Sequence, residues 1–207
     1  MFSFRYHGIL IDILPTGIGV LHTAYTLMDY LSHRHPAGWI QAGIGGAFDL
    51  SLAIGQVYCI ERELLIGTGA QDANGRIMDP FEMNWLDKNE APYMDGKLIC
   101  PYIPDIPGLN IATGMTTLHA HGNLTSIENA REHTHGQIEN MEGAPFFYIS
   151  LMKNIPFLSI RAVSNVVETR DKSKWKTDLA ITHLNQVLIG WLRDKKILDR
   201  LVNLKNL

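Results

Sequence analysis

Short apolar runs alternate along the chain with longer segments in which apolar residues recur at helical spacing. The runs predict β-strands over residues 9–14, 39–42, 56–60, 98–102, 110–113 and 157–164. The longer segments predict helices that begin near residues 19, 125 and 143, and a C-terminal helix over residues 178–204. This alternation favours βαβ units. We therefore expect an α/β fold: one three-layer α/β/α domain over residues 1–207 with a mixed, largely parallel central sheet.

Polar turns follow three of the predicted strands, and ligands bind beyond the carboxyl ends of strands in sheets of this kind. These turns span residues 43–46, 113–117 and 164–165. The first is rich in glycine, which lets the backbone approach a ligand closely. Its spacing fits neither the dinucleotide-binding fingerprint nor a P-loop, and a tight turn without a ligand remains the alternative. Residues 67–97 are rich in Gly, Asp, Asn and Pro and predict a long irregular excursion.

The composition narrows the class of protein without changing this architecture. The 207 residues are 46% hydrophobic and 19% charged, as in ordinary globular proteins, and the net charge is −3. No basic patch supports nucleic-acid binding. No stretch approaches about 18 consecutive apolar residues, so we expect no membrane span, and the pattern of the first residues does not predict a signal peptide. Cys59 and Cys100 are expected to be buried and unpaired, which fits a cytoplasmic protein.

Three polar residues stand where their chemistry needs an explanation. Glu142 precedes an apolar helix, where its carboxylate faces either solvent or a cleft. Arg161 lies inside an apolar strand and requires a partner, for which Glu142 is the obvious candidate. Asn165 ends that strand and offers both a donor and an acceptor. The alternatives are a plain first-turn acid, a purely structural ion pair and a turn-forming asparagine.

Other kinds of site have little support in the sequence. The pairs His119/His121 and His133/His135 lack companion ligands, so we expect no metal site. There is no Gly-x-Ser-x-Gly elbow and no cysteine in a catalytic setting. We therefore expect no cofactor.

Four segments, in this order and at this spacing, resemble the superfamily of nucleoside phosphorylases and nucleosidases. They are Thr16–Gly19, Gln41–Phe48, Glu139–Ala144 and Pro156–Asn165. Each is modest alone, but the ordered set spans nearly the whole chain. Within the superfamily the chain resembles the futalosine hydrolases, to which Gly69–Asp72 adds a further match. The resemblance implies the fold of that superfamily, a small nucleoside as substrate, and hydrolysis of its N-glycosidic bond through an oxocarbenium-like sugar.

The resemblance also assigns roles to residues at matching positions. Glu142 is expected to hold the ribose 2′-hydroxyl and orient the attacking water, and Arg161 to position that water or Glu142. Asn165 is expected to bind the purine. The other substrate contacts implied by the resemblance are Gly45, Gly46, Thr116, Thr117, Asn140, Met141 and Ser164.

Asn165 stands where the adenine-specific members of the superfamily carry an aspartate. Aspartate accepts from the exocyclic amine of adenine, whereas an amide can donate to the oxygen of a 6-oxopurine and accept from a protonated N7. A site built for one pattern leaves groups unpaired with the other. We therefore expect release of hypoxanthine from futalosine, a step of menaquinone biosynthesis that leaves dehypoxanthinylfutalosine. The alternatives are an adenine-releasing methylthioadenosine, S-adenosylhomocysteine or aminofutalosine nucleosidase, and a phosphorylase.

The chain departs from the superfamily at its start. Members usually begin with a strand and a turn bearing an acid that activates water, whereas this chain begins near their second strand, at Met1–Phe4. We expect the first strand and its acid to be absent, which leaves a nucleoside-binding homologue with impaired catalysis as a further alternative. Arg76, Trp85 and Lys88 are candidates for contacts to the 5′ substituent. Because relatives often complete that pocket from a neighbouring subunit, we expect a homodimer or larger homo-oligomer.

Overall fold

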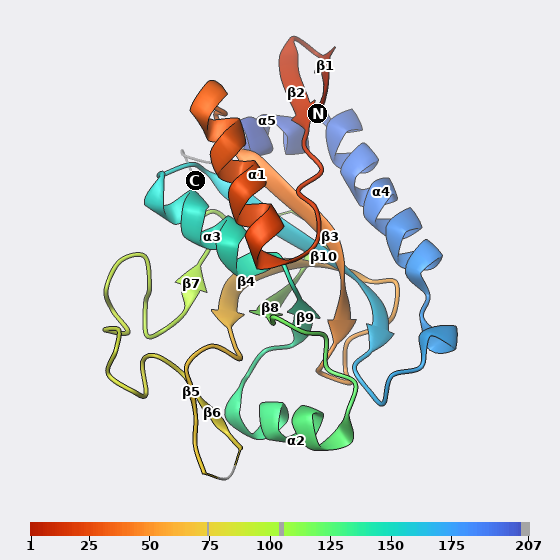
Figure 1. Ribbon diagram of the computed structural model, residues 1–207. Coiled ribbons are helices and arrows are strands. Elements are labelled where there is room, and N and C mark those ends of the chain that lie inside the picture. Colours follow the sequence, from red (N-terminus) through yellow and green to blue (C-terminus); the bar gives the residue numbers. More distant parts are fainter. Residues whose placement is uncertain (74, 104–105, 204–207) are drawn as a thin grey trace.

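The computed structural model describes residues 1–73, 75–103 and 106–203, and a six-stranded mixed sheet lies at its centre (Figure 1). In spatial order its strands are β10 (Phe157–Val166), β3 (Trp39–Ala47), β9 (Ile138–Asn140), β8 (Asn110–Thr116), β4 (Val57–Leu65) and β7 (Leu98–Ile99). β10 is parallel to β3, and β8 is parallel to β4 and β9, whereas β3–β9 and β4–β7 are antiparallel. β10 also pairs with β4, so five of the strands close on themselves.

Helices flank this sheet (Figure 1). α1 (Gly19–His33) packs against α3 (Gly143–Met152), which contacts β4 and β8. α4 (Thr177–Arg193) packs against β10 and β3, and α5 (Lys195–Val202) packs against α4. α2 (Leu124–His133) lies at the end of the molecule opposite the N-terminus. The arrangement confirms the predicted α/β fold with a mixed central sheet.

Two small hairpin sheets and a short helix complete the described structure. β1 (Phe2–Tyr6) pairs with β2 (Ile9–Ile13), and β5 (Ala70–Gln71) pairs with β6 (Ile77–Met78) within the predicted irregular excursion. A 3-10 helix, η1 (Lys172–Lys174), precedes α4. Among the described residues, no helix combines the length and the apolar character that crossing a membrane requires.

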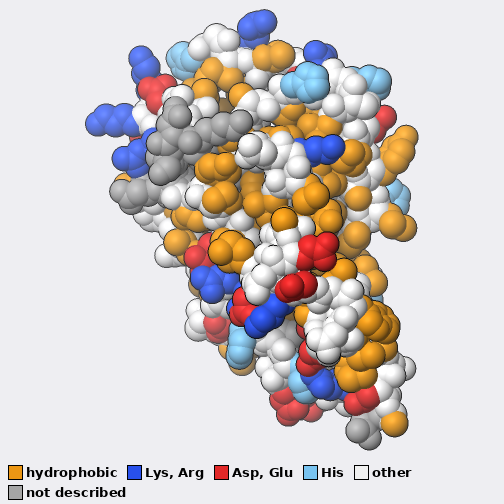
Figure 2. All heavy atoms as spheres, turned by 90° about the vertical axis from the view of Figure 1, so that its left-hand side faces the viewer, with side chains coloured by type: hydrophobic (Ala, Val, Ile, Leu, Met, Phe, Trp, Pro, Cys, Tyr) orange, Lys and Arg blue, Asp and Glu red, His pale blue; other side chains and the backbone are white. Residues whose placement is uncertain are grey.

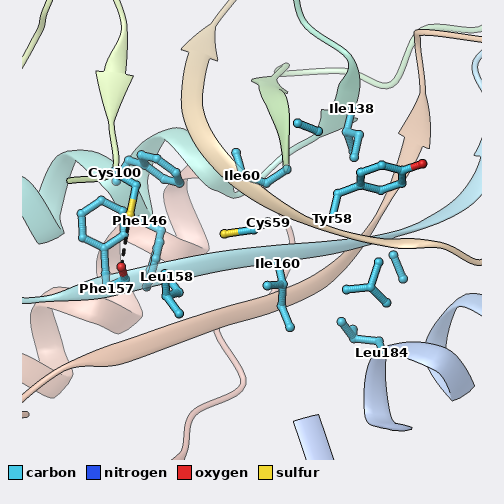
Figure 3. Packing of buried hydrophobic residues seen from close by; sticks show 14 of the residues in the cluster. Tyr58, Cys59, Ile60, Cys100, Ile138, Phe146, Phe157, Leu158, Ile160 and Leu184 are labelled. Carbon is cyan, nitrogen blue, oxygen red and sulfur yellow. Dashed lines mark hydrogen bonds between the residues drawn. The ribbon is translucent and has the colours of Figure 1, made fainter. Parts of the chain in front are cut away.

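The core is built where β4, β10 and α3 meet (Figure 3). The ring of Phe157 packs edge-on against those of Phe146 and Phe147, with centroids 5.6 and 4.9 Å apart. Such aromatic contacts on several sides explain why α3 is apolar almost all round. Cys59 and Cys100 are buried and free, as predicted, and the Cys100 thiol lies 3.2 Å from the Phe157 carbonyl oxygen.

Four predicted strands are longer than the sequence indicated, among them β4, which continues beyond residue 60 to Leu65. The glycine-rich segment 43–46 is not a turn but the second half of β3. β8 continues through Gly114 to Thr116, and β10 continues through Asn165 to Val166. Glycine in a strand interior often marks a close approach of another group. At Gly114 that group is the Glu63 carboxylate, with which an added side chain would collide.

The predicted C-terminal helix is two helices. They are separated at Asp194, whose carboxylate accepts from the N–H groups of Lys196 and Ile197 at 2.9 and 3.2 Å and so caps α5. Leu204, the predicted end of the helix, lies outside the described residues. The pattern of apolar residues did not predict four strands, β1, β5, β6 and β9, and the last three of these have only two or three residues each.

Candidate active site

A cavity of about 470 Å³ lies where β3, β9 and β10 end, beside the start of α1. Eight of the residues that the sequence singled out line it: Gly45, Gly46, Asn140, Met141, Glu142, Arg161, Ser164 and Asn165. The turn before α1, residues 16–18, and the last residue of β10 with the segment that follows it, residues 166–171, form other parts of its wall. The fold thus gathers the candidate catalytic residues and most of the candidate contacts around one space.

Thr116 and Thr117, which the resemblance placed in the pocket, are not among the described residues that line this cavity. The Thr116 hydroxyl is buried, donates to Glu63 Oε1 at 2.7 Å and accepts from the Ala144 N–H at 2.7 Å. The Thr117 hydroxyl donates to the His119 carbonyl at 2.8 Å. The Thr116 hydroxyl is therefore bonded to the first turn of α3 and does not face a ligand, so Thr116 supports the residues of the cavity wall.

Glu142 is the N-cap residue of α3, and its carboxylate points toward the start of α1. Oε1 accepts from the Gly19 N–H at 2.9 Å, and Oε2 accepts from the Met141 N–H at 3.3 Å. Gly19 is the first residue of α1, where the helix dipole stabilises an anion. Gln41 Nε2 donates to the Glu142 carbonyl at 2.9 Å. The carboxylate is therefore fixed at the cavity wall and keeps lone pairs for a ligand hydroxyl or a water.

Arg161 is the buried cation of the site, and it faces the partner that the sequence suggested. Its Nη1 lies 4.0 Å from Glu142 Oε2, and its Nη2 donates to Asn140 Oδ1 at 3.4 Å. Burial lowers the pKa of Arg161, while the charges of Glu142 and Glu63 act in the opposite direction. Gly43 is the β3 neighbour of Arg161 and leaves the space that the guanidinium occupies. Arg161 is therefore a buried cation that the charges of two acids stabilise.

Asn165 lies at the end of β10 with its side chain beside Gly46. The Ser164 hydroxyl donates to Asn165 Oδ1 at 2.7 Å and lies 3.1 Å from the Gly45 carbonyl oxygen. Asn165 Nδ2 donates to the Val166 carbonyl at 2.9 Å. Because Oδ1 has a second lone pair and Nδ2 a second hydrogen, the amide keeps one acceptor and one donor for a ligand.

Glu63, a buried acid that the sequence analysis missed, supports the site from within the sheet. Its Oε1 accepts from the Thr116 hydroxyl at 2.7 Å and from Asn140 Nδ2 at 2.8 Å. Asn140 Oδ1 in turn accepts from the N–H groups of Gly143 and Glu142 at 2.6 and 3.0 Å. This network connects β4, β8 and β9 to the start of α3, and thereby to the backbone of Glu142. The predicted strand ended at residue 60, so Glu63 was not expected to be buried. The only signal in the sequence was its position close to an apolar run.

The buried Glu63 carboxyl should make the free energy of unfolding depend on pH. Burial raises its pKa from 4.5 to about 7, although the Thr116 hydrogen bond and the Arg161 charge lower it. Since the folded-state pKa is above the unfolded one, its contribution is complete below about pH 4.5 and is lost as the pH rises through about 7. We expect the free energy of unfolding to fall by about 3 kcal/mol more in wild type than in Glu63→Gln between pH 5 and pH 8.5. Urea denaturation at both pH values measures the difference.

The matched control for this prediction is Glu61→Gln. Glu61 is two residues away and pairs with Arg62 at 2.7 Å on a more exposed part of β4. This variant should keep the wild-type pH dependence. An identical pH dependence in Glu63→Gln and wild type would show that the Glu63 carboxyl is not held neutral by burial.

The other residues that the sequence proposed for ligands are distributed differently. The described residues contain no group of three or more His, Cys, Asp or Glu side chains placed to hold a metal ion. Of the four grouped histidines, His121 lines the cavity and lies against Glu139. Arg76 and Lys88 each pair with an acid in their own segment, and Trp85 is exposed. None of these three is among the described residues lining the cavity.

Among curated proteins, two sequence relatives match the chain, and both are futalosine hydrolases. No family model matches the chain. The futalosine hydrolase of Thermus thermophilus is 27% identical over 179 residues, which cover 83% of this chain and 76% of the relative. The futalosine hydrolase of Streptomyces coelicolor is 24% identical over 183 residues, which cover 86% of this chain and 76% of the relative.

Solved structures share the fold. A 5′-methylthioadenosine/S-adenosylhomocysteine nucleosidase from Colwellia psychrerythraea, in complex with adenine, has a TM-score of 0.73 at 15% identity and covers 96% of this chain and 81% of its own. The futalosine hydrolase of Helicobacter pylori has a TM-score of 0.69 at 12% identity, with 97% and 82% covered. The chain thus has the fold of the nucleosidase superfamily. Its sequence is similar to the futalosine hydrolases along most of its length, which confirms the resemblance drawn from its motifs.

Proposed function

We propose that the chain is an N-glycosyl hydrolase that releases hypoxanthine from futalosine and leaves dehypoxanthinylfutalosine, a step of menaquinone biosynthesis. The observation that carries this proposal is that Glu142, Arg161 and Asn165 line one cavity, in a chain whose sequence relatives are futalosine hydrolases. The proposal includes a cytoplasmic location, which the two free, buried cysteines support.

The sugar side of the cavity is the Glu142 side. Cleavage of an N-glycosidic bond builds positive charge on the sugar ring. The Glu142 carboxylate, fixed by the Gly19 N–H, can accept from the ribose 2′-hydroxyl and stabilise that charge. It can also orient a water for attack on the anomeric carbon, from the face opposite the base. Arg161, 4.0 Å from that carboxylate, holds it in position.

The base side of the cavity is the Asn165 side. The leaving purine gains negative charge and needs a proton or a strong hydrogen bond at N7. The free acceptor of Asn165 suits a protonated N7, and its free donor suits the 6-oxo group of hypoxanthine. The Ser164 hydroxyl, by donating to Oδ1, sets which end of the amide accepts. This pattern supports a 6-oxopurine substrate.

The test is incubation of the purified protein with futalosine in phosphate-free buffer, with hypoxanthine followed by chromatography. Release without phosphate is expected. Release that requires phosphate would identify a phosphorylase instead. Tight binding of hypoxanthine with no release from futalosine would identify a nucleoside-binding protein, and either result would overturn the hydrolase.

The adenine-releasing nucleosidase is the second candidate, and Asn165→Asp separates it from the first. A carboxylate accepts from a 6-amino group but repels a 6-oxo group, so we expect kcat/KM to shift toward aminofutalosine, relative to futalosine, by at least about tenfold. Assays of both substrates with wild type and variant measure the shift. Asn203→Asp, at an exposed helix end, is the control. An unchanged ratio in Asn165→Asp would remove this residue from base recognition.

We also propose that a second copy of the chain covers the exposed face of α1. Ile18, Leu21 and Tyr25 are 76, 82 and 74% exposed. Figure 2 views the side of the molecule that carries α1 and α3 and shows hydrophobic side chains gathered there. Contiguous apolar patches of this kind mark interaction surfaces. Analytical ultracentrifugation should give the mass of a dimer or a larger homo-oligomer, and a stable monomer at micromolar concentration would overturn this proposal.

A further inference from the structure

One row of residues crosses the three strands that end at the cavity. Gly46 on β3 is the pairing partner of Asn165 on β10 and also of Glu139 on β9. Residues paired in this way point to the same face of a sheet. A side chain at Gly46 would lie 3.3 Å from Asn165 Nδ2, which agrees with that placement. With strands spaced about 4.8 Å apart, the Asn165 and Glu139 backbones lie about 10 Å apart with a bare glycine between them.

Glu139 is a buried acid in the cavity wall that the mechanism above does not use. Its side chain is 6% exposed and lines the cavity. Oε1 accepts from the His121 backbone N–H at 3.1 Å, and Oε2 is hydrogen-bonded to His121 Nδ1. The His121 ring packs edge-on against Phe48, with centroids 5.5 Å apart. Burying a charged carboxylate is costly unless it is hydrogen-bonded. His121 holds this carboxylate in one orientation, and its oxygens keep further lone pairs for a ligand.

The two side chains that flank Gly46 are complementary to two edges of one purine. A 6-oxopurine presents an N7 and O6 edge and, next to it, a hydrogen on N1. A 6-aminopurine has a lone pair on N1 instead. A carboxylate accepts a hydrogen bond from N1–H of the 6-oxopurine, whereas it repels the N1 lone pair of the 6-aminopurine. Asn165 contacts only the N7 and O6 edge. It therefore cannot distinguish a purine with a hydrogen on N1 from one without it.

We propose that Glu139 is the second purine-recognition residue of the site and accepts a hydrogen bond from N1–H of the 6-oxopurine, while Asn165 binds the N7 and O6 edge. This inference rests on the proposed function and adds a determinant of its specificity. His121 is the positioning residue that orients the carboxylate. Gly46 lies between the two contacts, and a side chain added there would meet Val167 at 2.7 Å and Asn165 Nδ2 at 3.3 Å.

Binding of hypoxanthine and of its 1-deaza analogue tests the inference. The analogue keeps the ring shape and the 6-oxo group but carries C–H in place of N1–H. We expect wild type to bind hypoxanthine about 10- to 100-fold more tightly than the analogue, since hydrogen bonds to charged groups contribute on that scale. In Glu139→Gln the His121 N–H holds the amide oxygen, the amide NH2 faces N1, and the ratio should narrow to within about threefold. Isothermal calorimetry measures all four affinities.

Glu132→Gln, which changes an exposed acid on α2, is the control and should keep the wild-type ratio. A ratio near one in wild type overturns the inference even if Glu139→Gln does not fold. An unchanged ratio in a folded Glu139→Gln also overturns it and leaves Glu139 as a structural partner of His121. Failure of wild type to release hypoxanthine from futalosine is a separate result, which counts against the proposed function.

Discussion

Glu142→Gln is expected to lower kcat for futalosine by about 10²- to 10⁴-fold, the range that a positioned acid–base group contributes. The amide keeps the size of the side chain, and its oxygen can still accept from the Gly19 N–H. It lacks the negative charge that we propose stabilises the sugar cation, and its NH2 group would face the Arg161 guanidinium, which lies 4.0 Å from Oε2. Single-turnover release of hypoxanthine measures the loss.

The control for this prediction is Glu90→Gln, which changes an exposed acid outside the described cavity lining. Circular dichroism should show that both variants fold, since Glu142 also begins α3. If folded Glu142→Gln keeps kcat within about threefold of wild type, then Glu142 is only an acid at a helix start, and the attacking water is oriented by another group.

The Arg161–Glu142 pair shows which part of the site could be predicted from the sequence. A cation inside an apolar strand requires a partner in any fold, because an unpaired buried charge is too costly. An acid just before a buried helix was therefore a sound candidate, and the structure places the two side chains 4.0 Å apart. The alternation of strands and helices similarly sufficed for the fold class, because both periodicities are local properties of the chain.

Features that depend on tertiary neighbours could not be predicted in this way. Glu63 follows an apolar run in a charged stretch, and only the pairing of β4 with β8 brings it to Thr116 and Asn140. The motif match placed Thr116 correctly at the end of its strand. It did not predict which face of the sheet the side chain lies on, and the hydroxyl points to the start of α3. The three-residue β9 is too short to show a period.

The glycines of β3 show the same limit. Local propensity assigns Gly43–Gly46 to a turn, since glycine weakens a strand. The structure supplies the reason for a strand here: each of these glycines borders a group that takes the space of a side chain. At Gly45 that group is Ile138, 2.5 Å from the position of an added Cβ, and at Gly46 it is Val167, 2.7 Å away.

Gly43→Ala is expected to lower the free energy of unfolding by about 3 kcal/mol and to reduce activity with it. The added methyl group would overlap the Arg161 guanidinium, which is buried and cannot move aside without leaving Glu142 and Asn140. Overpacking costs about 1–3 kcal/mol, and disrupting a buried charge pair costs about 3–5 kcal/mol. Displacement of Arg161 also frees the Glu142 carboxylate, so kcat should fall together with stability. Urea denaturation and the futalosine assay measure the two effects.

Gly190→Ala is the matched control, because it makes the same chemical change inside α4, where an added Cβ meets no atom within 4 Å. Alanine is the better helix former, so this variant should gain about 0.5–1 kcal/mol and keep full activity. A Gly43→Ala protein as stable and active as wild type would mean that Arg161 has another position of similar energy. In that event the contact with Arg161 would not fix the orientation of the Glu142 carboxylate, and the roles that we propose for these two residues would have to be abandoned.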